Sequence, residues 1–324
     1  NLVFPSDILV DSNDNVLAVG NLVADVAFGT QGASTTTQLG FVAMSDSQGV
    51  WQWVETLSTY GGGGFSGTTA ITQVGFDYYV CGWFSGNITF GNQNYRSTQD
   101  TQDIFVSKIS SQGSFDWTIT AGGPYVDTCE DIASDSSGGL YAAGSFNNSA
   151  NFQSMAKTSQ GDFDAWFANI NTGQVVAGNR WSWVSTVGGS TSDYGTCIQS
   201  NGNDIFGCGW FTGTANFGTG QPVQAIGQLD SYILKMTSSG GTVEMAQAGA
   251  TGGIVQIMDM LEDAGLMETE REETTLYDGR EWRIHYWLLK IAEIQRRTDA
   301  GPKYAPDDME PSVYDEIPDD IWSR

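Results

Sequence analysis

The stretch DILVDSNDNVLAVG at residues 7–20 recurs three times in this chain and decides its fold. The other copies read TAITQVGFDYYVCG at 69–82, DIASDSSGGLYAAG at 131–144 and TCIQSNGNDIFGCG at 196–209. The four copies align without gaps, and each ends in a glycine: Gly20, Gly82, Gly144 and Gly209. A period of about 62 residues, continuing to about Gly253, identifies a repeat protein.

Each repeat predicts four β-strands. The quoted stretch gives two, a third run follows a variable polar loop, and a fourth lies around Trp53, Trp117, Trp183 and Met245. Short apolar runs separated by Asp, Asn, Ser and Gly are typical of strands and turns. A four-stranded sheet cannot bury both faces alone, so the sheets stack radially as a propeller or linearly as a solenoid. The period favours an all-β propeller over residues 1–253, with blades starting near 7, 69, 131 and 196 and either four tight blades or part of a larger ring.

The repeat also carries an apolar-Asp-Ser-x-Gly hairpin, a Gly-aromatic step, an Asp-aromatic-Val-x-Lys strand and a final Trp with Gly-Gly. This pattern resembles the SBBP-type β-propeller repeats of bacteria and archaea. The resemblance implies the fold over about 250 residues. It implies no chemistry, because that family shares no catalytic motif.

Residues 254–324 form a different module. Helical periodicity from Ile254 to Leu261, strands flanking Asp278-Gly279, and a second amphipathic run up to about Arg297 predict a helix, hairpin and helix. This segment, 254–297, resembles the latter part of a haloarchaeal-type winged-helix domain; the alternative is an element that docks on the propeller or a partner. Residues 298–324 predict an extended, acidic, Pro-rich tail.

The net negative charge of the chain limits the classes of partner that it can bind. The chain holds 13 Lys and Arg against 38 Asp and Glu, a net charge of -25, and residues 1–253 hold few of the basic ones. Such a chain repels nucleic acid and anionic membranes, and no stretch is long and apolar enough to span a bilayer. The absence of an initiator Met suggests a processed product or fragment. We therefore expect an extracellular, cell-surface or virion-surface location.

The acidic turns and the cysteines are candidate sites. Calcium needs several oxygens converging on one point, and the weak candidates are Asp11, Asp14, Asp135 and Asp204. Tight turns use Asp for their own hydrogen bonds, which is the competing interpretation, and no other cofactor is expected. Cys197 and Cys208 face each other across a predicted hairpin and are candidates for a disulfide; buried free thiols are the alternative.

The function most consistent with the sequence is binding. The only histidine is His285, outside the repeats, so the propeller cannot hold a Ser-His-Asp triad. Trp83 and Trp210 share one repeat position and suit either the core or a sugar-stacking surface, while Asn87 and Asn147 begin glycosylation sequons. We expect a non-enzymatic protein that binds a glycan, a receptor or a neighbouring subunit, with the C-terminal segment as its attachment element. The alternatives are a purely structural component of a capsid, spike or surface layer, a transcriptional regulator fragment and a glycan-active enzyme.

Overall fold

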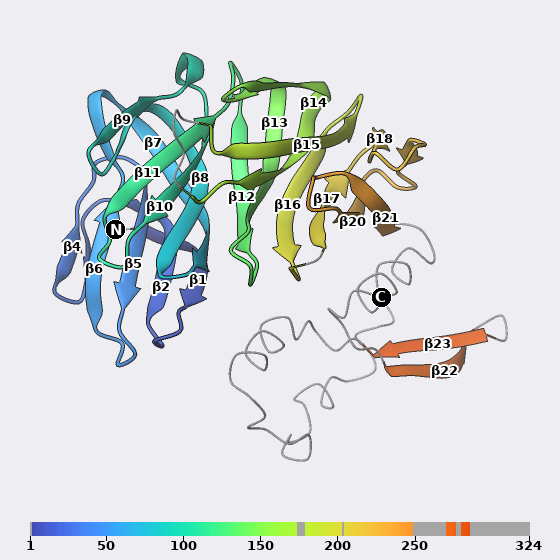
Figure 1. Ribbon diagram of the computed structural model, residues 1–324, viewed down its shortest axis with the longest axis horizontal. Helices are drawn as coiled ribbons and strands as arrows, with labels where there is room; N and C mark the ends of the chain where they lie inside the picture. The colour runs from blue at the N-terminus through green and yellow to red at the C-terminus, as the bar shows by residue number, and fades with distance from the viewer. Residues whose placement is uncertain (1, 174–178, 203, 249–269, 277–279, 286–324) are drawn as a thin grey trace. The chain divides into compact units, whose positions relative to one another are not determined.

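The computed structural model describes residues 2–173, 179–202 and 204–248, and the backbone of 270–276 and 280–285. The chain divides into two units, Asn1–Ile257 and Met258–Arg324. The first unit is a β-propeller of four blades, each a sheet of antiparallel strands in chain order. The all-β propeller expected from the repeats is therefore confirmed (Figure 1).

The four main strands of each blade coincide with the predicted runs. Blade 1 consists of β1 (Leu2–Val10), β2 (Val16–Val23), β5 (Leu39–Ser45) and β6 (Trp51–Thr56). Blade 2 consists of β7 (Ser58–Val74), β8 (Asp77–Phe90), β10 (Asp103–Ile109) and β11 (Phe115–Ala121). The connection between the second and third main strands holds additional short elements in both blades. In blade 1 these are β3 (Val26–Phe28) and β4 (Gln31–Ala33), and in blade 2 they are β9 (Gln93–Arg96) and the 3-10 turn η1 (Thr98–Asp100).

Blades 3 and 4 repeat this plan. Blade 3 consists of β12 (Asp127–Ser134), β13 (Leu140–Phe152), β14 (Met155–Ile170) and β15 (Trp181–Gly189). Blade 4 consists of β16 (Asp193–Ser200), β17 (Ile205–Phe211), β20 (Asp230–Met236) and β21 (Thr242–Ala248). The short strands β18 (Thr214–Asn216) and β19 (Val223–Gln224) lie beside β15.

The repeated glycine has a steric cause. A Cβ built on Gly20, Gly82, Gly144 or Gly209 would lie 2.1, 2.0, 2.0 or 1.8 Å from a backbone oxygen of the first strand of the same blade. Real Cβ atoms do not approach so closely, so only glycine fits. In every blade a β-bulge in the first strand lies next to this glycine, at Ser6, Thr69, Glu130 and Thr196.

The gapless alignment of the repeats is wrong by one residue in the first strand of blades 2 and 4. Val19 pairs with Asp7 and Ala143 with Asp131, whereas Cys81 pairs with Ala70 and Cys208 with Cys197. The bulge and the glycine keep their positions, and the hairpins of blades 2 and 4 are one residue shorter between them. Ile8, Ile71, Ile132 and Ile198 are therefore the equivalent residues in the structure.

A run of four glycines such as Gly61–Gly64 would by itself predict a flexible loop between blades, but the structure places it within a strand. The run lies inside β7, at a register irregularity between the pairs Thr59/Ile88 and Gly64/Gly86. Gly61, Gly62 and Gly63 all have positive φ, the conformation that favours glycine. The run is thus a bulged part of the sheet.

In the second unit, β22 (Glu270–Leu276) and β23 (Arg280–His285) pair antiparallel, as the hairpin prediction required. The predicted helices around 254–264 and 286–297, the Asp278-Gly279 turn and the tail at 298–324 lie outside the described residues. The described part of the chain contains no helix long and apolar enough to cross a membrane.

Candidate functional site

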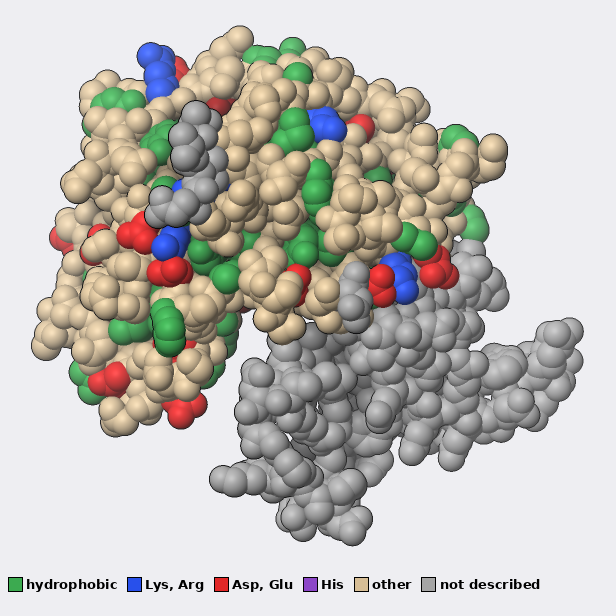
Figure 2. All heavy atoms as spheres, viewed as in Figure 1, with side chains coloured by type: hydrophobic (Ala, Val, Ile, Leu, Met, Phe, Trp, Pro, Cys, Tyr) green, Lys and Arg blue, Asp and Glu red, His purple; other side chains and the backbone are tan. Residues whose placement is uncertain are grey.

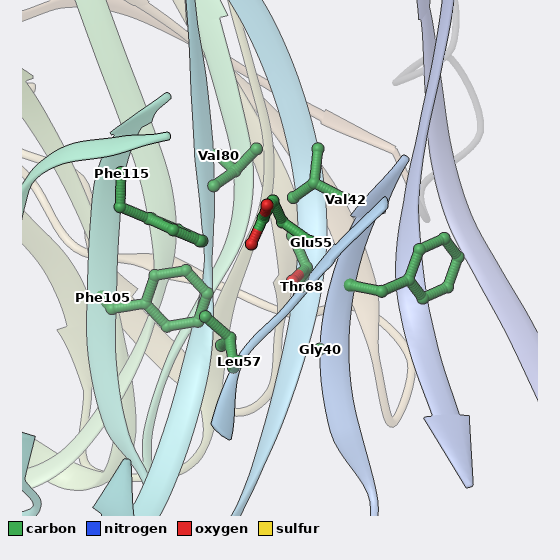
Figure 3. A pocket seen from close by; sticks show the side chains of 9 residues that line it. Gly40, Val42, Glu55, Leu57, Thr68, Val80, Phe105 and Phe115 are labelled. Atoms are coloured by element: carbon green, nitrogen blue, oxygen red, sulfur yellow. The ribbon is translucent and has the colours of Figure 1, made fainter. Parts of the chain in front are cut away.

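Consecutive blades bury one face against the next. We call the face of a blade that meets the preceding blade its rear face, and the face that meets the following blade its forward face. Leu17, Val19 and Val42 of blade 1 cluster with Ile71 and Val80 of blade 2. Figure 3 shows the same junction, with Val42, Leu57, Val80 and Phe105 around the Glu55 carboxylate, whose pKa is raised by burial.

Two further clusters join blades 2 and 3 and blades 3 and 4 in the same way. Extensive contacts join each blade to the next, and none of comparable extent joins blade 4 to blade 1 in the described part of the chain. Figure 1 places these two blades at opposite ends of the row of sheets. The four blades therefore form an open arc that leaves one rear face and one forward face without a neighbouring blade.

The exposed fractions of the four equivalent isoleucines show that the rear face of blade 1 is uncovered. Ile71, Ile132 and Ile198 are 5%, 3% and 0% exposed, because each lies against the preceding blade, whereas Ile8 is 65% exposed. Four further apolar side chains of β1 are exposed with it: Leu2, Val3, Phe4 and Val10. A contiguous exposed apolar strand of this kind marks an interaction surface in a soluble protein.

The rest of the visible surface is mostly neutral and polar. Figure 2 shows backbone and uncharged polar atoms over most of the propeller, with few basic side chains. Lys108 of blade 2 and Lys235 of blade 4 each form an ion pair within their own blade. Lys108 Nζ lies 2.9 Å from an Asp77 oxygen, and Lys235 Nζ lies 3.0 Å from an Asp204 oxygen.

The blades alternate between two types. On the rear face, blade 1 carries Ile8, Ala18, Phe41 and Ala43 where blade 3 carries Ile132, Ala142, Trp166 and Ala168. The aromatic triads also match: Phe28 lies 5.3 Å from Phe41 and 5.2 Å from Trp51, and Phe152 lies 5.3 Å from Trp166 and 5.1 Å from Trp181. Blades 1 and 3 are thus one type, the odd blades.

Blades 2 and 4, the even blades, share another set of residues on the forward face. Blade 2 carries Thr69, Tyr79, Cys81, Val106 and Lys108 where blade 4 carries Thr196, Phe206, Cys208, Ile233 and Lys235. The chain is therefore a tandem of two blade pairs, odd then even. Only parts of this pattern are visible in the sequence alone, such as the shared repeat position of Trp83 and Trp210.

Polar contacts between blades follow the same alternation. From odd to even blades, Asp7 Oδ2 accepts from the Ile71 N–H at 2.9 Å, and Asp131 Oδ2 accepts from the Ile198 N–H at 2.8 Å. From even to odd, Thr69 Oγ1 donates to the Cys129 carbonyl at 2.8 Å. Thr196, the equivalent of Thr69, is exposed on the forward face of blade 4.

Buried carboxyl groups lie where blades meet, and sequence analysis did not single them out as a set. Burial raises the pKa of Asp127 to about 8, with a smaller contribution from Asp103, and raises the pKa of Asp103 to about 6. At the next junction, burial raises the pKa of both Asp164 and Asp193 to about 6. The sequence signal was an Asp at the first position of strands β10, β12 and β16, together with Asp164 inside β14, which is equivalent to Asp103 by register.

The calcium candidates lie in three separate hairpin turns. Asp11 accepts from the N–H groups of Asn13 and Asn15 and from the Tyr78 hydroxyl, and Asp135 accepts from Ser137, Gly139 and Tyr141. Asp14 adopts a positive φ of 61° in the first of these turns. With Asp204 paired to Lys235, these carboxylates serve the turns and the sheet, and they do not converge on one point.

The four cysteines divide into two pairs. Cys197 and Cys208 face each other across β16 and β17 and form a disulfide on the forward face of blade 4. Cys81 and Cys129 are free and buried at the junction of blades 2 and 3, where burial raises the pKa of the Cys129 thiol.

Trp83 and Trp210 are both half-buried and differ in their neighbours. Trp83 lies over Gly67, whereas Trp210 stacks on Tyr194 with ring centroids 4.0 Å apart, and Tyr194 stacks on Phe163 at 5.0 Å. Of the sequon residues, Asn87 donates its Nδ2 to the Gly61 carbonyl, and Asn147 donates its backbone N–H to Asp127. Both asparagines are half-buried.

Comparison with known proteins finds a match for the C-terminal segment. Residues 254–324 match a family of unknown function (DUF6015). No curated protein matches the chain. The match is confined to the C-terminal segment, so it says nothing about the propeller.

Proposed function

We propose that this chain is a non-enzymatic binding module whose propeller associates with a neighbouring protein subunit through the rear face of blade 1. The carrying observation is Ile8, which is exposed although its three equivalents are buried against a preceding blade. Exposed apolar side chains on the face of a sheet favour association with another protein, because burial removes them from water.

A surface or extracellular setting belongs to the same proposal. The Cys197–Cys208 disulfide supports it, since disulfides persist in oxidising compartments. The low content of basic residues in the propeller also supports it, because this composition disfavours nucleic acid as a partner. The C-terminal segment is proposed as the attachment element.

The test is hydroxyl-radical footprinting of the purified 324-residue chain over a wide range of concentration. We expect Ile8 and Val10 to react in dilute solution and to become protected at high concentration. Phe76, an exposed residue in the hairpin turn of blade 2, serves as the control and should react under all conditions. Equal reactivity of β1 at all concentrations would count against the proposal.

A second candidate function is glycan binding at the aromatic stack formed by Phe163, Tyr194 and Trp210. The specific observation is the half-exposed Trp210 at the end of this stack. Aromatic rings offer apolar surface of the kind that fits the faces of sugars. A glycan array probed with the wild type and with Trp210→Ala tests it. Binding that the variant loses while remaining folded supports the candidate, and an array without any binding excludes it.

A further inference from the structure

We infer that the occupant of the blade 1 rear face is blade 4 of a second copy of this chain, docked head to tail so that the alternation of blades continues. The inference rests on the function proposed above and names the partner. It also assigns a role to the forward face of blade 4, which no neighbouring blade covers.

The first step is that the required interface already exists inside the chain. The junction of blades 2 and 3 joins an even forward face to an odd rear face. Blade 4 and blade 1 are the remaining even forward face and odd rear face. A second copy placed after blade 4 would therefore recreate a junction that the sequence already specifies once.

The second step is the match of the rear faces. Ile132, Ala142 and Ala168 of blade 3 lie in the cluster shared with blade 2. Blade 1 offers the same three residue types, Ile8, Ala18 and Ala43, in the same register. Blade 2 instead offers Ile71, Val80 and Ser107, and blade 4 offers Ile198, Gly207 and Leu234, so the pattern is specific to odd blades.

The third step is the match of the forward faces. Cys81 and Val106 of blade 2 are fully buried against blade 3, whereas their equivalents Cys208 and Ile233 of blade 4 remain half-exposed. A covering blade would complete their burial. The apolar character of both faces makes this burial favourable, at about 25 cal/mol for each Å² removed from water.

The fourth step is a polar group that lacks its expected acceptor. Thr69 Oγ1 contacts the Cys81 carbonyl of its own blade at 3.1 Å and the Cys129 carbonyl of the next blade at 2.8 Å. Thr196 Oγ1 repeats the contacts within its own blade, to the Cys208 carbonyl at 3.5 Å and to Cys208 Sγ at 3.6 Å, but no following blade offers it a carbonyl in the described part of the chain. By register, Pro5 is the equivalent of Cys129, so the Pro5 carbonyl of the second copy would supply the second acceptor.

The experiment is a complementation test on the full chain, followed by light scattering and native mass spectrometry. Ile8→Asp blocks the rear face of blade 1, and Ile233→Asp or the more exposed Thr196→Asp blocks the forward face of blade 4. We expect the wild type to form species of two or more copies, and each blocked variant to lose them. An equimolar mixture of one rear-face and one forward-face variant should regain a species of two copies.

The control is Phe76→Asp, an equally drastic change at an exposed residue away from both faces, which should assemble like the wild type. Circular dichroism and thermal unfolding check that each variant is folded. If Ile233→Asp does not fold, Thr196→Asp replaces it as the forward-face variant. If Ile8→Asp abolishes assembly but folded forward-face variants do not, blade 1 still binds a subunit and the head-to-tail inference fails. If the wild type remains a single copy, or if Ile8→Asp leaves assembly unchanged, the proposed function of the blade 1 rear face and the head-to-tail inference both fail.

Discussion

Asp131 of blade 3 and Ile198 of blade 4 are joined by a hydrogen bond of 2.8 Å from the Ile198 N–H to Asp131 Oδ2. The other carboxylate oxygen accepts from the Ile132 N–H at 2.8 Å, so one side chain connects the first strands of two blades. Asp7 makes the same contact with Ile71 at 2.9 Å. The odd blades thus hold the even blades that follow them through a charged acceptor at a fixed place.

Removing this acceptor should destabilise the propeller. We predict that Asp131→Ala lowers the free energy of unfolding by about 1–3 kcal/mol, because it leaves two backbone donors without their partner. Urea denaturation followed by circular dichroism measures the effect. The matched control is Glu130→Ala, since Glu130 is the exposed neighbour in the bulge. Equal effects of the two substitutions would contradict the assigned role of Asp131.

Much of this fold could be predicted from the sequence, because each strand is a short apolar run and each first hairpin ends in the same glycine. The pairing of Cys197 with Cys208 could also be predicted, since it depends only on register across one turn. The positions of the main strands are local properties, and local patterns carry them.

The alternation of blades was harder to find. A gapless alignment places Ile8 opposite Ala70, so the isoleucine shared by all four blades is not visible in it. The one-residue difference in hairpin length, taken up between the bulge and the turn, is a property of the folded sheet. The opening of the arc depends on contacts between distant segments, which no local pattern encodes.

The repeated glycine offers a second prediction. In Gly144→Ala the new methyl group would lie 2.0 Å from the Thr128 carbonyl oxygen, and backbone must move to relieve the clash. Overpacking of this kind costs about 3 kcal/mol. Gly32→Ala is the control, because nothing lies within 4 Å of a Cβ built there. Thermal unfolding of the two variants should separate them clearly; a similar melting temperature for both would show that the strand relaxes freely.

The disulfide offers a third prediction. The bond joins residues 11 apart in sequence, and closing a short loop in the unfolded chain contributes about 2–3 kcal/mol. The double variant Cys197→Ser with Cys208→Ser should lose this amount in denaturant unfolding. A reductant should bring the wild type to the same stability and leave the double variant unchanged. A wild type indifferent to reductant would argue against a contribution from the bond.

The last prediction concerns pH. Asp127, with its pKa raised to about 8, and Asp103, Asp164 and Asp193, with values of about 6, keep a proton in the folded state that the unfolded chain releases near pH 4. Stability should therefore be greatest near pH 4 and fall as pH rises, up to about pH 6 for three groups and about pH 8 for Asp127. Asp11, Asp135 and Asp230 have lowered pKa values and act in the opposite sense, losing stability only as the pH falls below about 4.

Asp127→Asn isolates the main contribution to this slope. The amide stays neutral at every pH, so between pH 6 and 8 the variant should lack the decline that Asp127 causes, which is at most about 1.4 kcal/mol for each pH unit. One of the two backbone donors, Gly123 N–H or Asn147 N–H, loses its acceptor, so the variant should also be less stable near pH 5. Urea denaturation at pH 5, 6, 7 and 8 measures both effects, with Asp25→Asn as an exposed control. A variant slope between pH 6 and 8 that equals the wild-type slope would mean that Asp127 is already ionised in the folded propeller.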